Sequence, residues 1–151
     1  MRCLIGIDDT DNLESRGTGF RARQLGGRLA EAGLGKVRGI TRHQLFVHPS
    51  IPYTSHNSSA CLDVDLDATR MGDLRDFCRD YLATASADGS DAGLCLVPFD
   101  GIPDEMVEFG RHLGVGLEIL PVAVPPGARH ADERHPGFDH APGHQRLLAE
   151  E

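Results

Sequence analysis

The stretch Cys3-Leu4-Ile5-Gly6-Ile7-Asp8-Asp9-Thr10-Asp11 places a short apolar run directly before a cluster of acidic residues. An apolar run of this length that ends in charged residues is typical of a buried strand. Such a strand would place Asp8 at its C-terminal end, and the polar residues 9–18 should follow as a loop. We take residues 3–7 as the first strand of the fold.

Three segments have the spacing of helices. From Phe20 to Ala32, apolar residues recur every three or four positions, and the glycine-containing segment from Gly33 to Gly35 ends the predicted helix. The clearest apolar stripe in the chain consists of Leu74, Phe77, Cys78, Tyr81, Leu82 and Ala85. A shorter helix starts at Pro103-Asp104 and is marked by Met106, Phe109 and Leu113.

Four further segments are predicted strands. They are residues 37–47, 60–67, 94–97 and 117–120, which are rich in apolar and β-branched residues. In residues 60–67, apolar side chains alternate with Cys61, Asp63, Asp65 and Asp67, which predicts that one face of the strand is exposed to solvent. The order β-α-β-β-α-β-α-β contains the ferredoxin-like β-α-β-β-α-β core. We therefore expect an α+β fold, a two-layer sandwich with an added helix and strand.

The composition indicates one ordinary globular domain. The chain has 151 residues, of which 40% are hydrophobic and 25% are charged. A formal charge of −8 argues against a strongly basic nucleic-acid surface, although a local arginine patch stays open. The four cysteines lie far apart, so we interpret them as reduced packing residues. No apolar run is long enough to cross a membrane, and we expect a cytoplasmic protein.

The character of the sequence changes after Leu120. Five of the nine prolines and four of the eight histidines fall between Pro121 and His144. We therefore expect a nucleotide-binding domain in residues 1–120 and an extended, mobile tail in residues 121–151. The histidines of the tail share no helical face, and we interpret them as surface residues, with zinc binding as the alternative.

The acidic cluster is the sharpest candidate site. Three carboxylates within four residues, Asp8, Asp9 and Asp11, repel one another, and a divalent cation such as Mg²⁺ would relieve that repulsion. The alternative is a solvated acidic turn that Asp11-Asn12 caps. The spacing Asp9-Thr10-Asp11 also fits haloacid-dehalogenase-like phosphatases, but Leu13 stands where that family has Thr or Val.

A glycine-containing loop follows the acidic cluster within ten residues. The segment from Ser15 to Gly19 ends at a predicted helix N-terminus, where free N–H groups and the helix dipole favour a phosphate. Arg16, Arg21 and Arg23 could add charge-assisted contacts, although a plain glycine-rich helix entry is the alternative. A cation site beside a phosphate site suggests a nucleoside triphosphate with magnesium.

Two motifs in the expected order resemble a known family. The first is Gly6-Ile7-Asp8-Asp9-Thr10-Asp11 with the loop that contains Thr18, and the second is Pro49-Ser50-Ile51-Pro52-Tyr53-Thr54 with Asn57. Over residues 1–120 the chain resembles the N-terminal catalytic domain of the archaeal tRNA-isoleucine agmatinylcytidine synthetases (TiaS) and their short bacterial relatives. The resemblance implies a kinase-like domain that binds ATP and magnesium and activates a cytidine of a tRNA.

The resemblance also implies roles for individual residues. Catalytic and metal-binding roles fall on Asp8, Asp9 and Asp11, and Thr18 lies near the reactive threonine of the family. Residues that would contact the nucleotide are Thr10, Arg16, Gly17, Gly19, Arg42, Tyr53 and Asn57. The loop Gly17-Thr18-Gly19-Phe20 departs from the usual G-M-C-T-T-Y of the family, so Thr18 could instead donate a hydrogen bond to phosphate.

Three functions follow as alternatives. The first is a magnesium-dependent, ATP-binding phosphotransferase or ATPase, a kinase-like or ligase-like enzyme whose acceptor is a nucleic acid or a small molecule. The second is a non-catalytic nucleotide-binding regulatory module, and the third is a truncated family member. The last two rest on the absence, after Leu120, of the glycine-rich and RNA-binding segments that the family carries.

Overall fold

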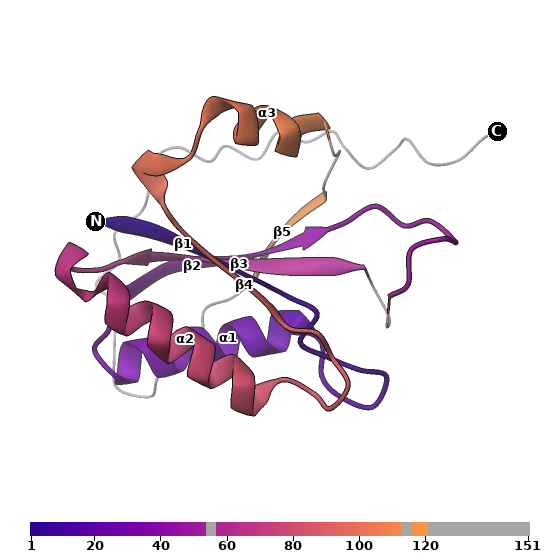
Figure 1. Ribbon diagram of the computed structural model, residues 1–151, viewed down its shortest axis with the longest axis horizontal. Helices are drawn as coiled ribbons and strands as arrows, with labels where there is room; N and C mark the ends of the chain where they lie inside the picture. The colour runs from indigo at the N-terminus through magenta and orange to yellow at the C-terminus, as the bar shows by residue number, and fades with distance from the viewer. Residues whose placement is uncertain (54–56, 113–115, 121–151) are drawn as a thin grey trace.

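A five-stranded sheet forms the centre of the molecule (Figure 1). The computed structural model describes residues 1–53, 57–112 and 116–120. The strands are β1 (Arg2–Asp8), β2 (Lys36–Gln44), β3 (Ser58–Asp65), β4 (Gly93–Pro98) and β5 (Gly116–Leu120). The helices are α1 (Thr18–Glu31), α2 (Met71–Ala85) and α3 (Asp104–His112), with short 3₁₀ turns at Ala68–Arg70 and Phe99–Gly101.

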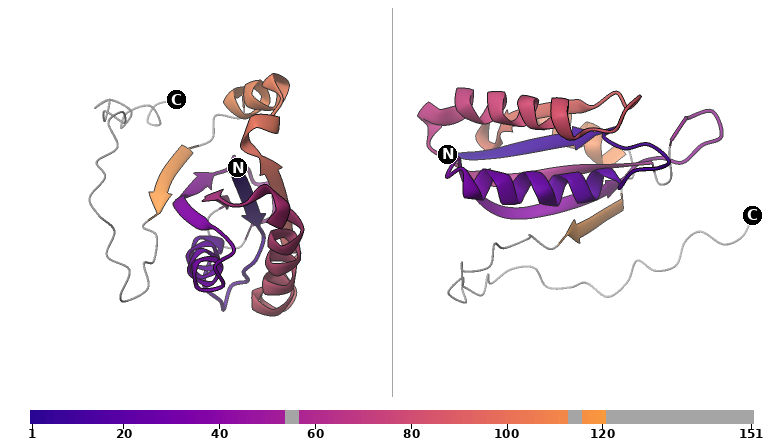
Figure 2. Two further views of the ribbon diagram at one scale, coloured as in Figure 1. Left: turned by 90° about the vertical axis from the view of Figure 1, so that its left-hand side faces the viewer. Right: turned by 90° about the horizontal axis from the view of Figure 1, so that it is seen from below.

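The strand order β4-β1-β3-β2-β5 and the all-antiparallel pairing confirm the predicted fold class. The first four strands, with α1 and α2, form the ferredoxin-like core, and β5 adds a fifth strand beside β2. Both helices cover the same face of the sheet, whereas α3 lies on its other side (Figures 1 and 2). The added helix and strand were therefore also predicted correctly.

The core lies between the sheet and the helix pair. Alternate residues of β1 and β3 are buried, as the strand period of two requires. Those residues pack against the predicted stripe of α2 and the inward face of α1. The fully buried side chains with the largest volumes include Ile5, Ile7, Leu25, Leu29, Ile40, Leu62 and Leu74.

The opposite face of the sheet is polar where β3 carries its aspartates. Arg2 makes two hydrogen bonds of 2.9 Å to the carboxylate of Asp63, and its guanidinium stacks 3.6 Å from the ring centroid of Phe99. Arg38, at a register shift in β2, pairs with Asp65 at 3.1 Å. The alternation predicted for residues 60–67 is thus confirmed, because the charged positions of β3 form ion pairs on the face away from α1 and α2.

Helix α3 has the predicted position in the sequence but buries none of its described residues. The exposed fractions of Met106 and Phe109 are 54% and 64%, although their spacing marks an apolar face.

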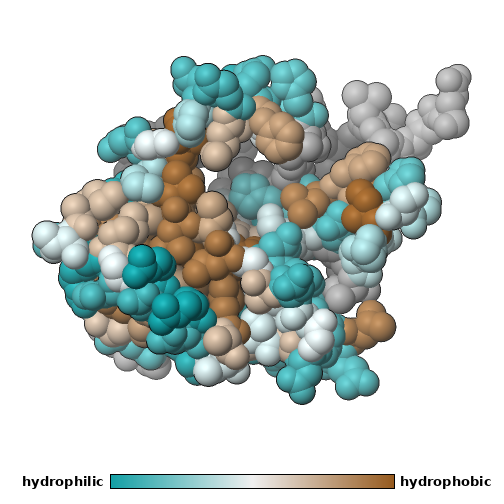
Figure 3. Space-filling model, viewed as in Figure 1, coloured by the Kyte–Doolittle hydropathy of each residue, from teal (hydrophilic) through white to brown (hydrophobic). Residues whose placement is uncertain are grey.

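On the side of the molecule that faces the viewer in Figure 3, an apolar band also runs along β4, which forms one edge of the described sheet. No helix in the described ranges is long and apolar enough to cross a membrane. The predicted Pro/His-rich tail lies outside the described residues.

Candidate functional site

The end of β1 turns sharply into the acidic loop. Asp9 adopts a left-handed backbone conformation with φ of 46°, which aspartate tolerates better than most residues. Its N–H donates to Asp8 Oδ1 at 2.9 Å, and its own Oδ2 accepts from the N–H of Asp91 at 3.2 Å. The N–H of Ala87 also donates to the Thr10 carbonyl at 3.0 Å. The loop is therefore fastened to the segment that joins α2 to β4.

Two buried threonines join the acidic loop to the start of α1. The Thr10 hydroxyl donates to Thr18 Oγ1 at 3.1 Å, and the Thr18 hydroxyl donates to Asp11 Oδ1 at 2.9 Å. Thr10 is fully buried, and Thr18 is 4% exposed. A hydroxyl has only one proton to donate, so in this arrangement Thr18 holds the Asp11 carboxylate in place.

The first turn of α1 presents free backbone donors. Gly17 caps the helix without a side-chain hydrogen bond, and its carbonyl accepts from the N–H groups of Phe20 and Arg21. In the described part of the chain, the N–H groups of Thr18 and Gly19 have no acceptor. Free N–H groups at a helix N-terminus, next to the helix dipole, can bind a phosphate. Phosphate binding by this loop stays a prediction, with which these free N–H groups are compatible.

Electrostatics single out Asp8 among the carboxylates. Partial burial raises the pKa of the Asp8 carboxyl, the hydrogen bond from Asp9 N–H opposes that rise, and the charges of Asp9 and Asp11 add to it. A cation near Asp8 would relieve the desolvation and the repulsion together.

The acidic loop provides a smaller ligand set for a metal than the sequence predicted. Across residues 1–53 and 57–112, no three His, Cys, Asp or Glu side chains cluster closely enough to hold a metal ion. The Asp9 carboxylate accepts a hydrogen bond from the Asp91 N–H, and the Asp11 carboxylate accepts one from the Thr18 hydroxyl. Mg²⁺ typically binds one or two carboxylates together with water and substrate phosphates. Asp8, together with the Asp11 carboxylate held by Thr18, would fit that pattern if phosphate oxygens completed the coordination.

The second predicted motif lies at the same end of the sheet. The C-terminal end of β2, the N-terminal end of β3 and the loop between them share that end with the acidic loop (Figure 1). Arg42 Nε donates to Ser58 Oγ at 3.1 Å, which holds the guanidinium along this edge. The Asn57 side chain donates to the Phe46 carbonyl and closes the β2–β3 loop, and Tyr53 is 48% exposed. Arg16 is exposed and stacks on Phe20 at 4.6 Å.

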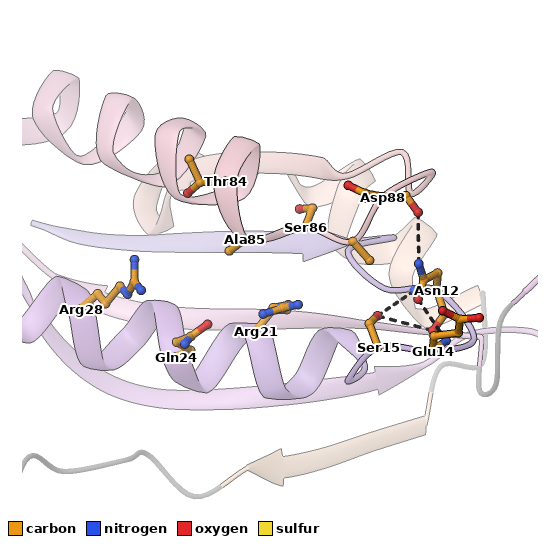
Figure 4. Close-up of a pocket in the computed structure, with 11 residues that line it drawn as sticks. Asn12, Glu14, Ser15, Arg21, Gln24, Arg28, Thr84, Ala85, Ser86 and Asp88 are labelled. Atoms are coloured by element: carbon orange, nitrogen blue, oxygen red, sulfur yellow. Dashed lines mark hydrogen bonds between the residues drawn. The ribbon is translucent and has the colours of Figure 1, made fainter.

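A groove that the sequence did not predict lies on the other side of α1. It has a volume of about 660 Å³ and lies between α1 and the C-terminal end of α2 (Figure 4). Its lining residues are Asn12, Glu14, Ser15, Arg21, Gln24, Arg28, Thr84, Ala85, Ser86, Ala87 and Asp88. Of the residues that the sequence suggested for phosphate contacts, Ser15 and Arg21 line it, whereas Asp8, Asp9 and Asp11 do not. The one signal in the sequence is the i, i+3, i+7 spacing of Arg21, Gln24 and Arg28, which places them on one helical face.

Tyr81 connects this groove to the core. The single proton of its hydroxyl is shared between two acceptors, Gln24 Oε1 at 2.8 Å and the Arg21 carbonyl at 3.1 Å. Burial raises the pKa of the Tyr81 phenol, and the nearby guanidiniums of Arg21 and Arg28 oppose that rise. The hydroxyl therefore fixes the Gln24 side chain so that its amide nitrogen is left as a donor.

Comparisons with known proteins bear on the fold. No family model and no curated protein matches the chain. A crystal structure of a tRNA fluorescent labeling enzyme matches at 24% identity and a TM-score of 0.56, over 80% of this chain and 33% of that one. A complex of TiaS with its isoleucine tRNA and ATP matches at 23% identity and a TM-score of 0.56, over 79% and 32%. Apo TiaS matches at 22% identity and a TM-score of 0.55.

These similarities establish the fold. The chain spans about a third of the length of the solved structures that it matches. The predicted likeness to TiaS is confirmed at this level, because the same arrangement of strands and helices covers four-fifths of the chain.

Proposed function

We propose that the chain is a magnesium-dependent, ATP-binding phosphotransferase or ATPase of the TiaS type. One observation carries the proposal, namely the hydrogen-bonded set Thr10, Thr18 and Asp11 that joins the acidic loop to the free N–H groups at the start of α1. The proposal is supported by this set because it links the Asp11 carboxylate, a candidate cation ligand, to the helix start whose amides are candidate phosphate ligands. The similar fold has been captured with ATP and tRNA in TiaS, which supports the choice of nucleotide.

In this proposal each group has a defined task. Asp8 and Asp11 would hold Mg²⁺, and the N–H groups of Thr18 and Gly19 would bind a phosphate oxygen. Arg16 and Arg42 would balance the charge that develops in phosphoryl transfer. When bound, Mg²⁺ neutralises the phosphates, and the acceptor hydroxyl belongs to a nucleic acid or a small molecule.

Ligand-induced stabilisation tests the binding part of the proposal. Mg²⁺ with ATP should raise the melting temperature, because a ligand that binds only the folded state stabilises it by mass action. Asp8→Asn and Asp11→Asn should abolish the rise. Glu14→Gln is the matched control, since Glu14 is an exposed acid of the same loop that accepts no hydrogen bond from Thr18. An unchanged ligand-induced rise in Asp8→Asn would refute the metal role.

Turnover tests whether the protein is an enzyme or a binder. The second candidate, a nucleotide-binding regulatory module, is favoured by the burial of Thr18, whose hydroxyl already donates to Asp11. If the chain is an enzyme, ATP labelled on the γ-phosphate should release labelled phosphate slowly or transfer it to Thr18. In the transfer, the bond between the γ-phosphorus and the bridging oxygen breaks as a bond to the acceptor oxygen forms. Tight ATP binding with no label released over hours would assign the chain to the second function.

A further inference from the structure

The groove between α1 and α2 contains arginines that form no ion pair with the described residues. Six described arginines outside this region form ion pairs, namely Arg2, Arg38, Arg70, Arg75, Arg79 and Arg111. By contrast, Arg16, Arg21, Arg23 and Arg28 have no carboxylate within ion-pair distance among the described residues. Two of these four, Arg21 and Arg28, line the groove. In a chain with a formal charge of −8, two guanidiniums in one groove without an ion-pair partner among the described residues indicate an anionic ligand.

Two polar atoms of the groove are buried without a partner. Among the described residues, Arg21 Nε and Ser86 Oγ are the buried side-chain atoms that make no hydrogen bond. They belong to opposite walls, Arg21 to α1 and Ser86 to the residue that ends α2. A buried donor without an acceptor destabilises the protein, and a hydrogen-bond acceptor that enters the groove would relieve that cost.

The side chains converge on the same space. Figure 4 shows Arg21, Gln24 and Arg28 projecting from α1 toward the end of α2, where Thr84 and Ser86 lie. The other end of the groove is formed by the loop residues Asn12, Glu14 and Ser15 with Asp88. The anionic part of a ligand therefore fits the end with the two arginines, because Glu14 and Asp88 would repel it at the other end.

We propose that this groove binds a phosphate ester, with Arg21 and Arg28 as the anion contacts and Ser86 as a hydrogen-bond partner. A guanidinium presents a planar fork of donors that matches phosphate oxygens. Arg21 and Arg28 lie two helical turns apart, which is about 10 Å along the axis, so they suit phosphates spaced along a chain. A volume of about 660 Å³ also holds more than a single phosphate. The site goes beyond the proposed function and shares none of its residues.

Binding of fluorescein-labelled pentauridylate, followed by anisotropy, tests the site. The experiment uses the full chain in EDTA, so that magnesium-dependent binding at the acidic loop does not contribute. We expect Arg21→Gln and Arg28→Gln each to weaken binding at least fivefold and to reduce the salt slope by about 0.7, the value for one phosphate contact on a single strand. Arg23→Gln is the matched control, because Arg23 lies on the same helix, has no ion-pair partner among the described residues and does not line the groove. It should change the affinity less than twofold.

Pyrophosphate, added as competitor, distinguishes the two sources of phosphate. Displacement by pyrophosphate at equal concentration assigns the groove to small phosphate-containing ligands, and displacement only in large excess assigns it to a polynucleotide strand. Arg28 is exposed, so Arg28→Gln should keep the wild-type melting temperature and serves if Arg21→Gln misfolds. Three results would overturn the proposal: no binding of either probe at millimolar concentration, an equal loss in Arg23→Gln, or an equal loss in Asp8→Asn.

Discussion

Two adjacent glycines in α1 provide a direct test of how this helix packs on the sheet. A Cβ atom added at Gly27 would meet nothing within 4 Å. At Gly26 the same atom would lie 3.2 Å from Ile40 Cδ1 and 3.5 Å from Leu62 Cδ2. The two positions share one helix and one kind of substitution, so any difference between Gly26→Ala and Gly27→Ala measures the contact with the sheet.

The magnitudes follow from helix propensity and packing. Alanine stabilises a helix interior over glycine by about 1 kcal/mol, so Gly27→Ala should raise the free energy of unfolding by about that amount. For a chain of this size, that gain corresponds to ~2–4 °C in melting temperature. At Gly26 the same gain is offset by crowding, which typically costs ~1–3 kcal/mol in a filled core. Gly26→Ala should therefore be neutral or destabilising.

Urea unfolding followed by circular dichroism, with both variants and wild type measured together, gives the two differences. The packing matters for function, because α1 holds Thr18 and the phosphate-binding N–H groups at its start. If Gly26→Ala gains as much stability as Gly27→Ala, the inward face of α1 does not pack against β2 and β3 as described. An equal loss in both variants would contradict the open space found at Gly27.

Three further predictions concern charge, core and thiols. Ionising Asp8 opposes folding because its pKa is raised in the folded state, so Asp8→Asn should increase the free energy of unfolding at pH 7. That gain should disappear in urea titrations below about pH 3.9, where the unfolded carboxyl is also protonated. Leu62→Ala should lower the free energy of unfolding by about 2–5 kcal/mol, because the Leu62 side chain is fully buried. Leu13 is 84% exposed, so Leu13→Ala should change it by less than about 0.5 kcal/mol in the same assay. Iodoacetamide at pH 8 should modify the exposed Cys95 first, since burial raises the pKa of the Cys61 thiol to about 11. Mass spectrometry at early time points measures the order of modification. If Cys61 is modified as fast as Cys95, Cys61 is not buried as described.

The sequence predicted the fold well because each element carries a local signal. The apolar residues of α2 repeat at helical spacing, and the same residues, such as Leu74 and Cys78, are buried in the structure. The alternation in β3 likewise predicted which of its faces is exposed to solvent. Helix α3 shows the limit of this reasoning, because its spacing predicted the helix but not that Met106 and Phe109 stay exposed. Burial depends on what packs against a face, and a single segment does not contain that information.

The candidate site divides in the same way. Sequence alone placed the acidic cluster after a buried strand and the phosphate loop before a helix, since both depend on residues close together in the chain. The bond from Thr18 to Asp11 and the fastening of Asp9 to Asp91 required the tertiary structure. So did the groove, whose walls come from residues 12–28 and 84–88. Antiparallel pairing and the helix layer bring these distant segments together, and no local pattern of side chains records which of them will meet.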